Sequence, residues 1–521
     1  MTNQIQNPYS QPQFQQPPMP RMMPPMLPQG NMRQRVANPM GRMYNLFPQW
    51  LTQYGVAVYI LALLVSSLMY SSYSLPWYHM LSGIVAVVVF FVYGHSLIEQ
   101  TSEKRIHKTK AFEKQMFRIS FIIRIVWTIL IYTIFMQAYG DAFGFENGDA
   151  VLYDDLGKDF AYGFRNNKFW ETWRNLNLSL DVSDLGYATY VGFIYWIVGN
   201  EAGLIAVRLL KCILSAITVL LIYRLALRNF GDQVARVAAI FVALWPNFWY
   251  ECGTHLKEVE MVFLSVLFVG QADQMLRSRQ FTVWKVVPLL LIASILLTFR
   301  TPLALVAFLS LIFSVVMSSS RVVNWGKRII VGGLSILLIV GTLGDFIQNK
   351  SSEFIRTAQA DEQKSNMEWR SRRVNGNAFA KYAGKSVFAP LIFTIPFPSF
   401  VRPYDGQDEQ QMRNGGNLVK NIMSFFTVFA IVALLITGKW REHLVPFSFM
   451  LGYLVVLAFS TFAQSERFHQ PAMPFEFMFA AYGLSIAVTK PKYKRWFMYW
   501  CGVMFVACVA WSWFKMAGRG L

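Results

Sequence analysis

Acidic side chains gather in one segment of the chain, directly after an apolar stretch. Residues 141–184 carry nine of the 29 Asp and Glu residues of the chain. The densest part of this segment contains Asp149, which follows an Asn-Gly pair, and Tyr153 four positions later. A positioned carboxylate can act as a general base on a hydroxyl group. Asp149 is therefore the first candidate for chemistry.

Simpler roles compete for the same carboxylates. The pattern predicts a short helix with apolar residues toward the membrane. A solvated acidic face is the simpler interpretation for three of its residues, Asp154, Asp155 and Asp159. Asp149 lies at the expected start of the helix, so capping of that helix is its simpler role.

Ionisable residues also recur at the ends of long apolar segments, where such side chains mark functional sites by default. Arg208 and Lys211 are three residues apart, which places them on one face of a helix. The other members of this group are Lys257, Glu258, Glu260, Arg300, Arg467, His469 and Glu476. Each alone is explained by snorkelling of a long side chain or by a buried ion pair. Their shared depth favours a polar cavity that opens to the outer side of the membrane.

These residue types fit one chemistry. The carboxylate of Asp149 would act as a general base on the hydroxyl of an acceptor. The arginines would hold the phosphate leaving group of a lipid-linked donor through charge-assisted, often bidentate contacts. The lipid tails of the donor would lie in grooves between helices.

The elements that position these residues are predicted to be transmembrane helices. The chain has 521 residues, of which 54% are hydrophobic and only 15% charged. Many apolar segments reach the roughly 20 residues that a helix needs to cross a bilayer. The net charge of +19 comes from Lys and Arg in short loops between these segments. That distribution fits the cytoplasmic loops of a membrane protein and argues against a continuous nucleic-acid-binding stripe.

The expected fold class is all-α, a bundle of thirteen transmembrane helices with two long external loops. The expected spans are residues 51–72, 78–99, 119–139, 203–223, 237–250, 257–276, 283–299, 302–319, 329–346, 420–437, 444–462, 471–489 and 496–514. Residues 186–199, which are rich in Tyr and Trp, are interpreted as an interfacial helix. This choice places five further basic loops on the cytoplasmic side together with residues 100–118. The amino terminus is then inside and the carboxyl terminus outside.

The same topology divides the chain into five parts. The first is a Gln-, Pro- and Met-rich tail, expected to be disordered in the cytoplasm. Two additional helices and a basic loop follow, then a transmembrane module with the acidic external loop 140–202. A second external loop precedes the last helices. The parts are residues 1–46, 47–118, 119–346, 347–419 and 420–521.

The order of these features resembles GT-C membrane glycosyltransferases, in particular the protein-mannosyltransferase and aminoarabinose-transferase superfamily (glycosyltransferase family 39-like). The resemblance covers residues 119–300 well and 464–489 thinly. Its pieces are Asp149, Tyr153 and Ala161, the aromatic stretch 186–199, the Arg208 helix ending before Phe230-Gly231, the segment Ala235–Pro246, Lys257-Glu258, and the Arg-aromatic-x-x-Pro-x-x-Pro pattern at 467–474. Many members have a second acid in the first loop, where this chain has Ala150.

The resemblance implies a transferase in a bacterial plasma membrane, with its active site outside the cytoplasm. Its donor would be a polyprenyl-phosphate-linked sugar and its acceptor a glycan, lipid or protein. Asp149 would be the catalytic base and Glu258 a second acidic residue. Substrate and phosphate contacts would come from Tyr153, Arg208, Lys211, Lys257, Arg300, Arg467 and His469. Some members use a divalent cation and others do not, so the metal stays undecided.

Two other functions share part of this pattern. A polysaccharide polymerase or ligase also acts on polyprenyl-linked glycans from outside, and would use Arg residues such as those of the loop 347–419. It does not require an early acidic motif, so substitution of Asp149 discriminates between the two enzymes. A transporter or flippase commonly shows internal repeats and charges near the bilayer midplane. This chain shows no repeat between its halves, and its charges are expected at the outer ends of helices.

Overall fold

The structure is a computed structural model. It describes residues 46–103, 109–144, 148–177, 182–278, 283–317, 391–402, 408–458 and 465–517, together with the single positions 326, 333 and 463. Within these residues every regular element is a helix, and one isolated bridge joins Ser74 to Val401. The predicted all-α class is therefore confirmed.

Seven helices in the described part of the chain are long and apolar enough to cross a membrane, as expected of an integral membrane protein. They are α3 (Gln49–Met69), the continuous run of α4 (Trp77–Val88), the π-helical turn Val89–Tyr93 and α5 (Gly94–Glu103), α6 (Thr109–Tyr139), α10 (Asn200–Phe230), α13 (Glu258–Arg277), α20 (Asn414–Ile436) and α24 (Pro491–Ala517). Four shorter apolar helices accompany them: α14 (Val286–Phe299), α15 (Thr301–Met317), α21 (Leu444–Ala458) and α23 (Met473–Ala487).

These helices do not confirm the predicted count of thirteen spans. The expected span 237–250 is not one continuous helix, because α11 (Asp232–Leu244) ends before α12 (Pro246–Cys252) begins. Proline lacks the N–H that helix continuation needs, and it pushes the preceding residue, Trp245, into an extended conformation. The expected span 329–346 lies outside the described residues except for position 333.

A buried arginine satisfies the carbonyl groups at this helix break. Arg124 of α6 is fully buried and donates hydrogen bonds to the carbonyl oxygens of Val242, at 3.3 Å, and Ala243, at 3.0 Å. Its guanidinium also lies 5.1 Å from the centre of the Phe248 ring. A cation at the carboxyl end of a helix interacts favourably with the helix dipole and with carbonyls that have no helical partner. Arg124 therefore fixes the end of α11.

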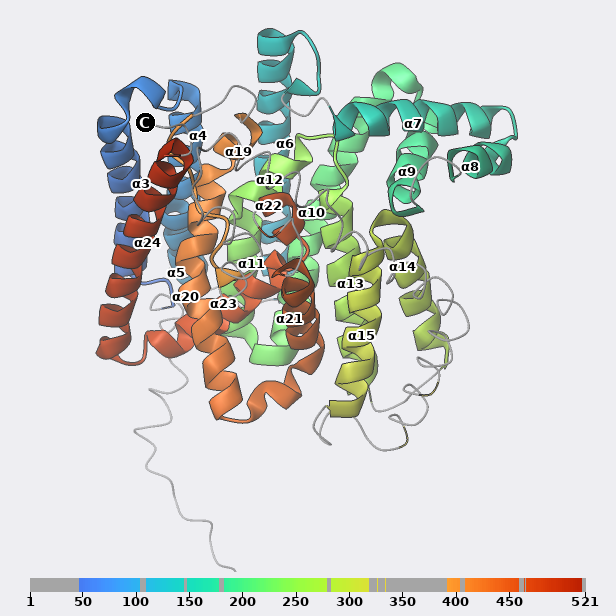
Figure 1. Cartoon of the computed structure of the whole chain (residues 1–521). Helices are drawn as coiled ribbons and strands as arrows, with labels where there is room; N and C mark the ends of the chain where they lie inside the picture. Colours follow the sequence, from blue (N-terminus) through green and yellow to red (C-terminus); the bar gives the residue numbers. More distant parts are fainter. Residues whose placement is uncertain are drawn as a thin grey trace, which may run out of the picture.

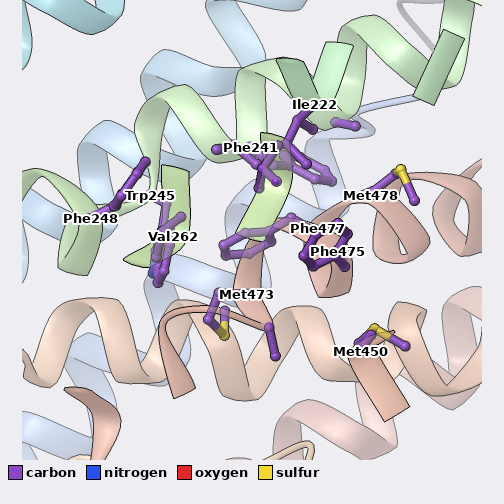
Figure 2. Packing of buried hydrophobic residues seen from close by; sticks show 14 of the residues in the cluster. Ile222, Phe241, Trp245, Phe248, Val262, Met450, Met473, Phe475, Phe477 and Met478 are labelled. Atoms are coloured by element: carbon purple, nitrogen blue, oxygen red, sulfur yellow. The ribbon is translucent and has the colours of Figure 1, made fainter. Parts of the chain in front are cut away.

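The core beside this break is aromatic. Phe241 of α11 and Trp245, which follows this helix, both pack against Phe477 of α23 (Figure 2). Their ring centroids are 6.2 and 5.7 Å, respectively, from that of Phe477. Ile222 of α10 belongs to the same cluster. This packing joins the early and late parts of the chain, which both contribute to the candidate site.

At one end of the bundle, ion pairs join basic and acidic residues of α6, α10 and α13. Arg224 pairs with Glu113 at 2.8 Å, and Arg228 with Asp273 at 3.1 Å. Arg277, which also pairs with Asp273 at 2.8 Å, donates to the backbone carbonyl of Glu442 at 2.5 Å. Basic segments that were predicted to share the cytoplasmic side thus meet in space.

Three helices form a layer at the other end. Figure 1 shows α7 (Asp149–Arg165) and α8 (Phe169–Asn177) lying across the end of the bundle, with α9 (Val182–Val198) beside them. Glycine allows the close approach of α7 and α9, since a Cβ at Gly192 would lie 2.9 Å from the carbonyl oxygen of Gly157. The segment expected to be interfacial is thus α9, which is not among the candidate spans. Asp149 is the first residue of α7 and therefore belongs to this layer.

Candidate functional site

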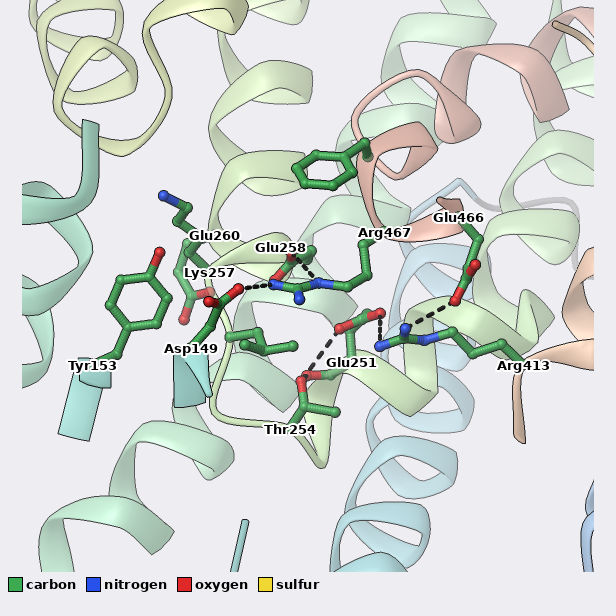
Figure 3. Close-up of polar contacts among 12 residues, drawn as sticks. Asp149, Tyr153, Glu251, Thr254, Lys257, Glu258, Glu260, Arg413, Glu466 and Arg467 are labelled. Carbon is green, nitrogen blue, oxygen red and sulfur yellow. Dashed lines mark hydrogen bonds and ion pairs between the residues drawn. The ribbon is translucent and has the colours of Figure 1, made fainter. Parts of the chain in front are cut away.

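The two carboxylates singled out in the sequence meet at one arginine. Arg467, from the one-turn helix α22 (Glu466–His469), lies between α7 and α13 (Figure 3). Its Nη2 is 3.2 Å from Oδ2 of Asp149, and its Nε is 3.0 Å from Oε1 of Glu258. Residues more than two hundred positions apart in the sequence therefore form one charged bridge.

The two carboxylates of this bridge differ in access to solvent. The side chain of Asp149 is 59% exposed, whereas that of Glu258 is 2% exposed. A general base must reach the hydroxyl from which it takes a proton. Asp149 meets that requirement, and Glu258 is placed instead to hold the guanidinium of Arg467.

Asp149 lies at the start of α7, where a capping role can be checked directly. Gly148 is the capping position of this helix, and no side chain makes a capping hydrogen bond there. The expectation that Asp149 caps the helix is therefore wrong, because Asp149 is the first helical residue and its carboxylate pairs with Arg467.

The solvated-face interpretation holds for two of the three other carboxylates of α7. Asp155 and Asp159 are exposed, as expected. Asp154 is buried, so the interpretation is wrong for this residue. Its carboxylate accepts a hydrogen bond of 2.5 Å from the hydroxyl of Tyr195 and pairs with Lys158 at 2.6 Å. Asp154 therefore ties α7 to α9.

Tyr153 and Lys257 are joined by a carboxylate that the sequence did not single out. The hydroxyl of Tyr153 donates to Oδ1 of Asp184 at 2.9 Å, and Nζ of Lys257 is 2.5 Å from the same oxygen. Burial lowers the pKa of Lys257, while Asp184 acts in the opposite direction. Burial and the nearby Asp184 raise the pKa of Tyr153. This group links α7, α9 and the start of α13.

Arg208 and Lys211 are buried in α10 and contact the backbone of neighbouring loops. Arg208 donates to the carbonyl of Ala142 at 2.5 Å. Lys211 donates to the carbonyls of Leu256 and, at 3.0 Å, Thr254, and its Nζ is 4.0 Å from Oε2 of Glu260. These contacts fix the loop that leads into α13.

The remaining predicted residues, Arg300 and His469, have other partners in the structure. The Arg300 guanidinium stacks 4.0 Å from the centre of the Phe468 ring. His469 is buried, and its Nδ1 is 2.5 Å from Nζ of Lys420. Burial and this lysine lower the pKa of His469 well below its usual value. Of these basic residues, Arg467 is the one that pairs with Asp149 among the described contacts of the site.

A second charged group, which sequence reasoning missed, adjoins the bridge (Figure 3). Arg413 is 1% exposed and lies 2.9 Å from carboxylate oxygens of both Glu251 and Glu466. It thereby connects α12, the start of α20 and α22. One signal in the sequence was the Glu466-Arg467 pair, which offers opposite charges from adjacent positions. The sequence places Arg413 in the external loop 347–419, among other Arg residues.

In the described ranges, no group of three or more His, Cys, Asp or Glu side chains is placed to hold a metal ion. Comparisons of the chain with protein families, with curated proteins and with solved structures found no match.

Proposed function

We propose that this chain is a membrane glycosyltransferase that transfers a sugar from a polyprenyl-phosphate-linked donor to an acceptor hydroxyl. The reaction would take place on the non-cytoplasmic face of the membrane. The observation that carries the proposal is the bridge from exposed Asp149 through Arg467 to buried Glu258. In this bridge Asp149, the candidate base, is directly paired with Arg467, the residue proposed to bind the phosphate.

The proposed reaction uses these groups in a single displacement. Asp149 takes the proton of the acceptor hydroxyl, and the acceptor oxygen forms a bond to the anomeric carbon of the sugar. The bond between that carbon and the phosphate oxygen breaks, and its electron pair leaves with the polyprenyl phosphate. Arg467 stabilises the negative charge that grows on the phosphate, since guanidinium groups match phosphate oxygens in shape and charge. Glu258 holds the guanidinium in place.

In this scheme Arg467 changes partner during the reaction. It pairs with Asp149 in the structure. An incoming phosphate competes for the same guanidinium, and its arrival frees the Asp149 carboxylate to accept a proton. The buried Glu258 keeps its contact throughout, because loss of a partner would leave its charge uncompensated.

The distribution of basic residues supports an outward-facing site. The ion pairs of Arg224, Arg228 and Arg277 lie at helix ends away from Asp149, and basic residues concentrate on the cytoplasmic side of membrane proteins. Asp149 follows α6, which begins near that basic end and finishes at Tyr139. The carboxylate is thus separated from the basic end by the length of a span.

Transfer assays with purified protein test the proposal. Wild type and Asp149→Asn are incubated with a panel of polyprenyl-phosphate sugars and candidate acceptors. We expect transfer by wild type and a loss of about 10²-fold or more in Asp149→Asn, the usual contribution of a general base. Asp159→Asn, an exposed position on the same helix, is the matched control and should retain activity. Full activity of Asp149→Asn would contradict the proposed function.

A further inference from the structure

A second set of polar groups lies next to the bridge, between α9, α13 and the loop before α13. It comprises Tyr187, Tyr190, His255 and Glu260. Both ring nitrogens of His255, both carboxylate oxygens of Glu260 and both tyrosine hydroxyls are buried, and none has a hydrogen-bond partner among the described residues. His255 and Glu260 are 0% and 3% exposed. Such groups are few in native structures, so four together require an explanation.

These four side chains lie close to one another and to Lys211. The His255 ring centroid is 6.0 Å from that of Tyr187, and Nζ of Lys211 is 5.5 Å from the centre of the same tyrosine ring. Lys211 is also 4.0 Å from the Glu260 carboxylate. Burial, and then the charge of Glu260, raise the pKa of Tyr190, and both causes also act on Tyr187. The Tyr190 ring centroid is 6.1 Å from that of Tyr187, which places both tyrosines in the same group.

The cluster is continuous with the candidate active site. Glu258 and Glu260 both belong to the first turn of α13, which Lys257 precedes (Figure 3). The Tyr187 ring centroid is 5.0 Å from that of Tyr153, which belongs to the Asp184 group. A ligand whose phosphate reached Arg467 could therefore extend its next chemical group toward these side chains.

The chemistry of the cluster selects one type of ligand group. A carboxylate accepts hydrogen bonds and repels phosphate, so the phosphate itself would not fit. A purely apolar group would leave the carboxylate, the hydroxyls and the imidazole unsatisfied. A sugar ring offers hydroxyls that can donate to Glu260 and accept from the tyrosines, and its carbon face can pack on aromatic rings.

We propose that Tyr187, Tyr190, His255 and Glu260 form the subsite for the sugar ring of the donor and determine which sugar is accepted. The assignment of the ligand as a sugar rests on the proposed glycosyltransferase function. The groups are buried, so entry of the sugar requires α9 or the loop 253–257 to move.

Binding measurements on the full-length protein test this subsite without requiring turnover. The protein is reconstituted in nanodiscs free of glycoside detergents, because such detergents carry sugars. Affinities are measured for decaprenyl phosphate and for decaprenyl-phosphate-linked mannose, glucose and galactose. We expect wild type to bind one of the sugar lipids at least about tenfold more tightly than decaprenyl phosphate, the effect of about one added hydrogen bond to a charged group.

Two variants remove single atoms or charges from the cluster. Glu260→Gln and Tyr190→Phe should each lower the advantage of the sugar lipid by about tenfold and leave the affinity for decaprenyl phosphate unchanged. Tyr190→Phe removes a hydroxyl that has no hydrogen-bond partner among the described residues, so it should not destabilise the protein. Ser265→Ala is the control, since this buried hydroxyl of α13 donates to its own helix at Met261.

The results separate this subsite from the proposed function. A wild type that binds no sugar lipid more tightly than decaprenyl phosphate would overturn the subsite, as would variants that keep the full sugar advantage. Transfer assays run on the same samples address the function independently. Absence of transfer together with a sugar advantage that the variants lose would contradict the glycosyltransferase and support the subsite.

Discussion

Replacement of Arg467 by Gln should destabilise the protein mainly through Glu258 and little through Asp149. Removal of one member of a buried ion pair costs about 3–5 kcal/mol, because the other charge stays buried without compensation. Glu258 is 2% exposed and fits that case. Asp149 is 59% exposed, and exposed pairs contribute only about 0–1 kcal/mol. We therefore expect a loss of about 3–5 kcal/mol in the free energy of unfolding.

A double-mutant cycle isolates the two partners. Asp149→Asn alone should lower the free energy of unfolding by no more than about 1 kcal/mol. Combining Arg467→Gln with Glu258→Gln removes both buried charges, so much of the stability lost in the single variant should return. The free energy of unfolding is measured by titration with SDS in mixed micelles.

Two results would refute this reasoning about the bridge. One is a loss in Asp149→Asn as large as that in Arg467→Gln. The other is a double variant of Arg467 and Glu258 that is as unstable as the sum of its single variants. Either result would mean that Glu258 is not the group that depends on Arg467.

Three further predictions concern the rest of the fold. Arg124→Leu should lower the free energy of unfolding by about 2–6 kcal/mol, because two buried carbonyls at the end of α11 lose their donor and each loss costs about 1–3 kcal/mol. The free energy is measured by SDS titration. An unchanged value would contradict the role assigned to Arg124. Burial, with Arg277 as the next cause, lowers the pKa of His443 to about 4. The unfolded chain takes up a proton near pH 6.5 while folded His443 stays neutral, so stability should fall by up to about 1.4 kcal/mol per unit as the pH drops from about 6.5 to 4. His443→Gln should lose this slope in thermal unfolding measured across that pH range, and an unchanged slope would assign it to other groups. Finally, cysteines introduced at Asp155 and Lys439 should react with an impermeant maleimide from opposite sides of the membrane, and labelling from one side would exclude the topology.

The helical architecture could be predicted because a bilayer leaves the chain few alternatives. Backbone groups in hydrocarbon must be hydrogen-bonded within the segment, so long apolar runs become helices. The same reasoning failed at residues 237–250, where hydropathy suggested one span. Pro246 breaks that segment, and Arg124 stabilises the break from another helix. Hydropathy carries no information about such a partner.

The residues of the candidate site could be predicted from the sequence, but not which acidic residue each basic residue contacts. The sequence places Asp149 in the first external loop and Glu258 and Arg467 at the outer ends of helices, and the three meet. Tyr153 and Lys257 were expected to contact substrate, yet both contact Asp184, at separations of 31 and 73 residues. Sequence spacing cannot show which carboxylate a distant cation will find, because that choice depends on how helices pack.

The position of Arg467 depends on ion pairs more than on its own helix. α22 has only four residues, and so short a helix is unstable by itself. Adjacent side chains hold it on two sides, since Glu466 pairs with Arg413 and Arg467 pairs with Glu258. The hydroxyl of Tyr453 adds a hydrogen bond of 2.9 Å to the carbonyl of Phe468. Arg413 is thus connected to the candidate site through Glu466, the residue that directly precedes Arg467.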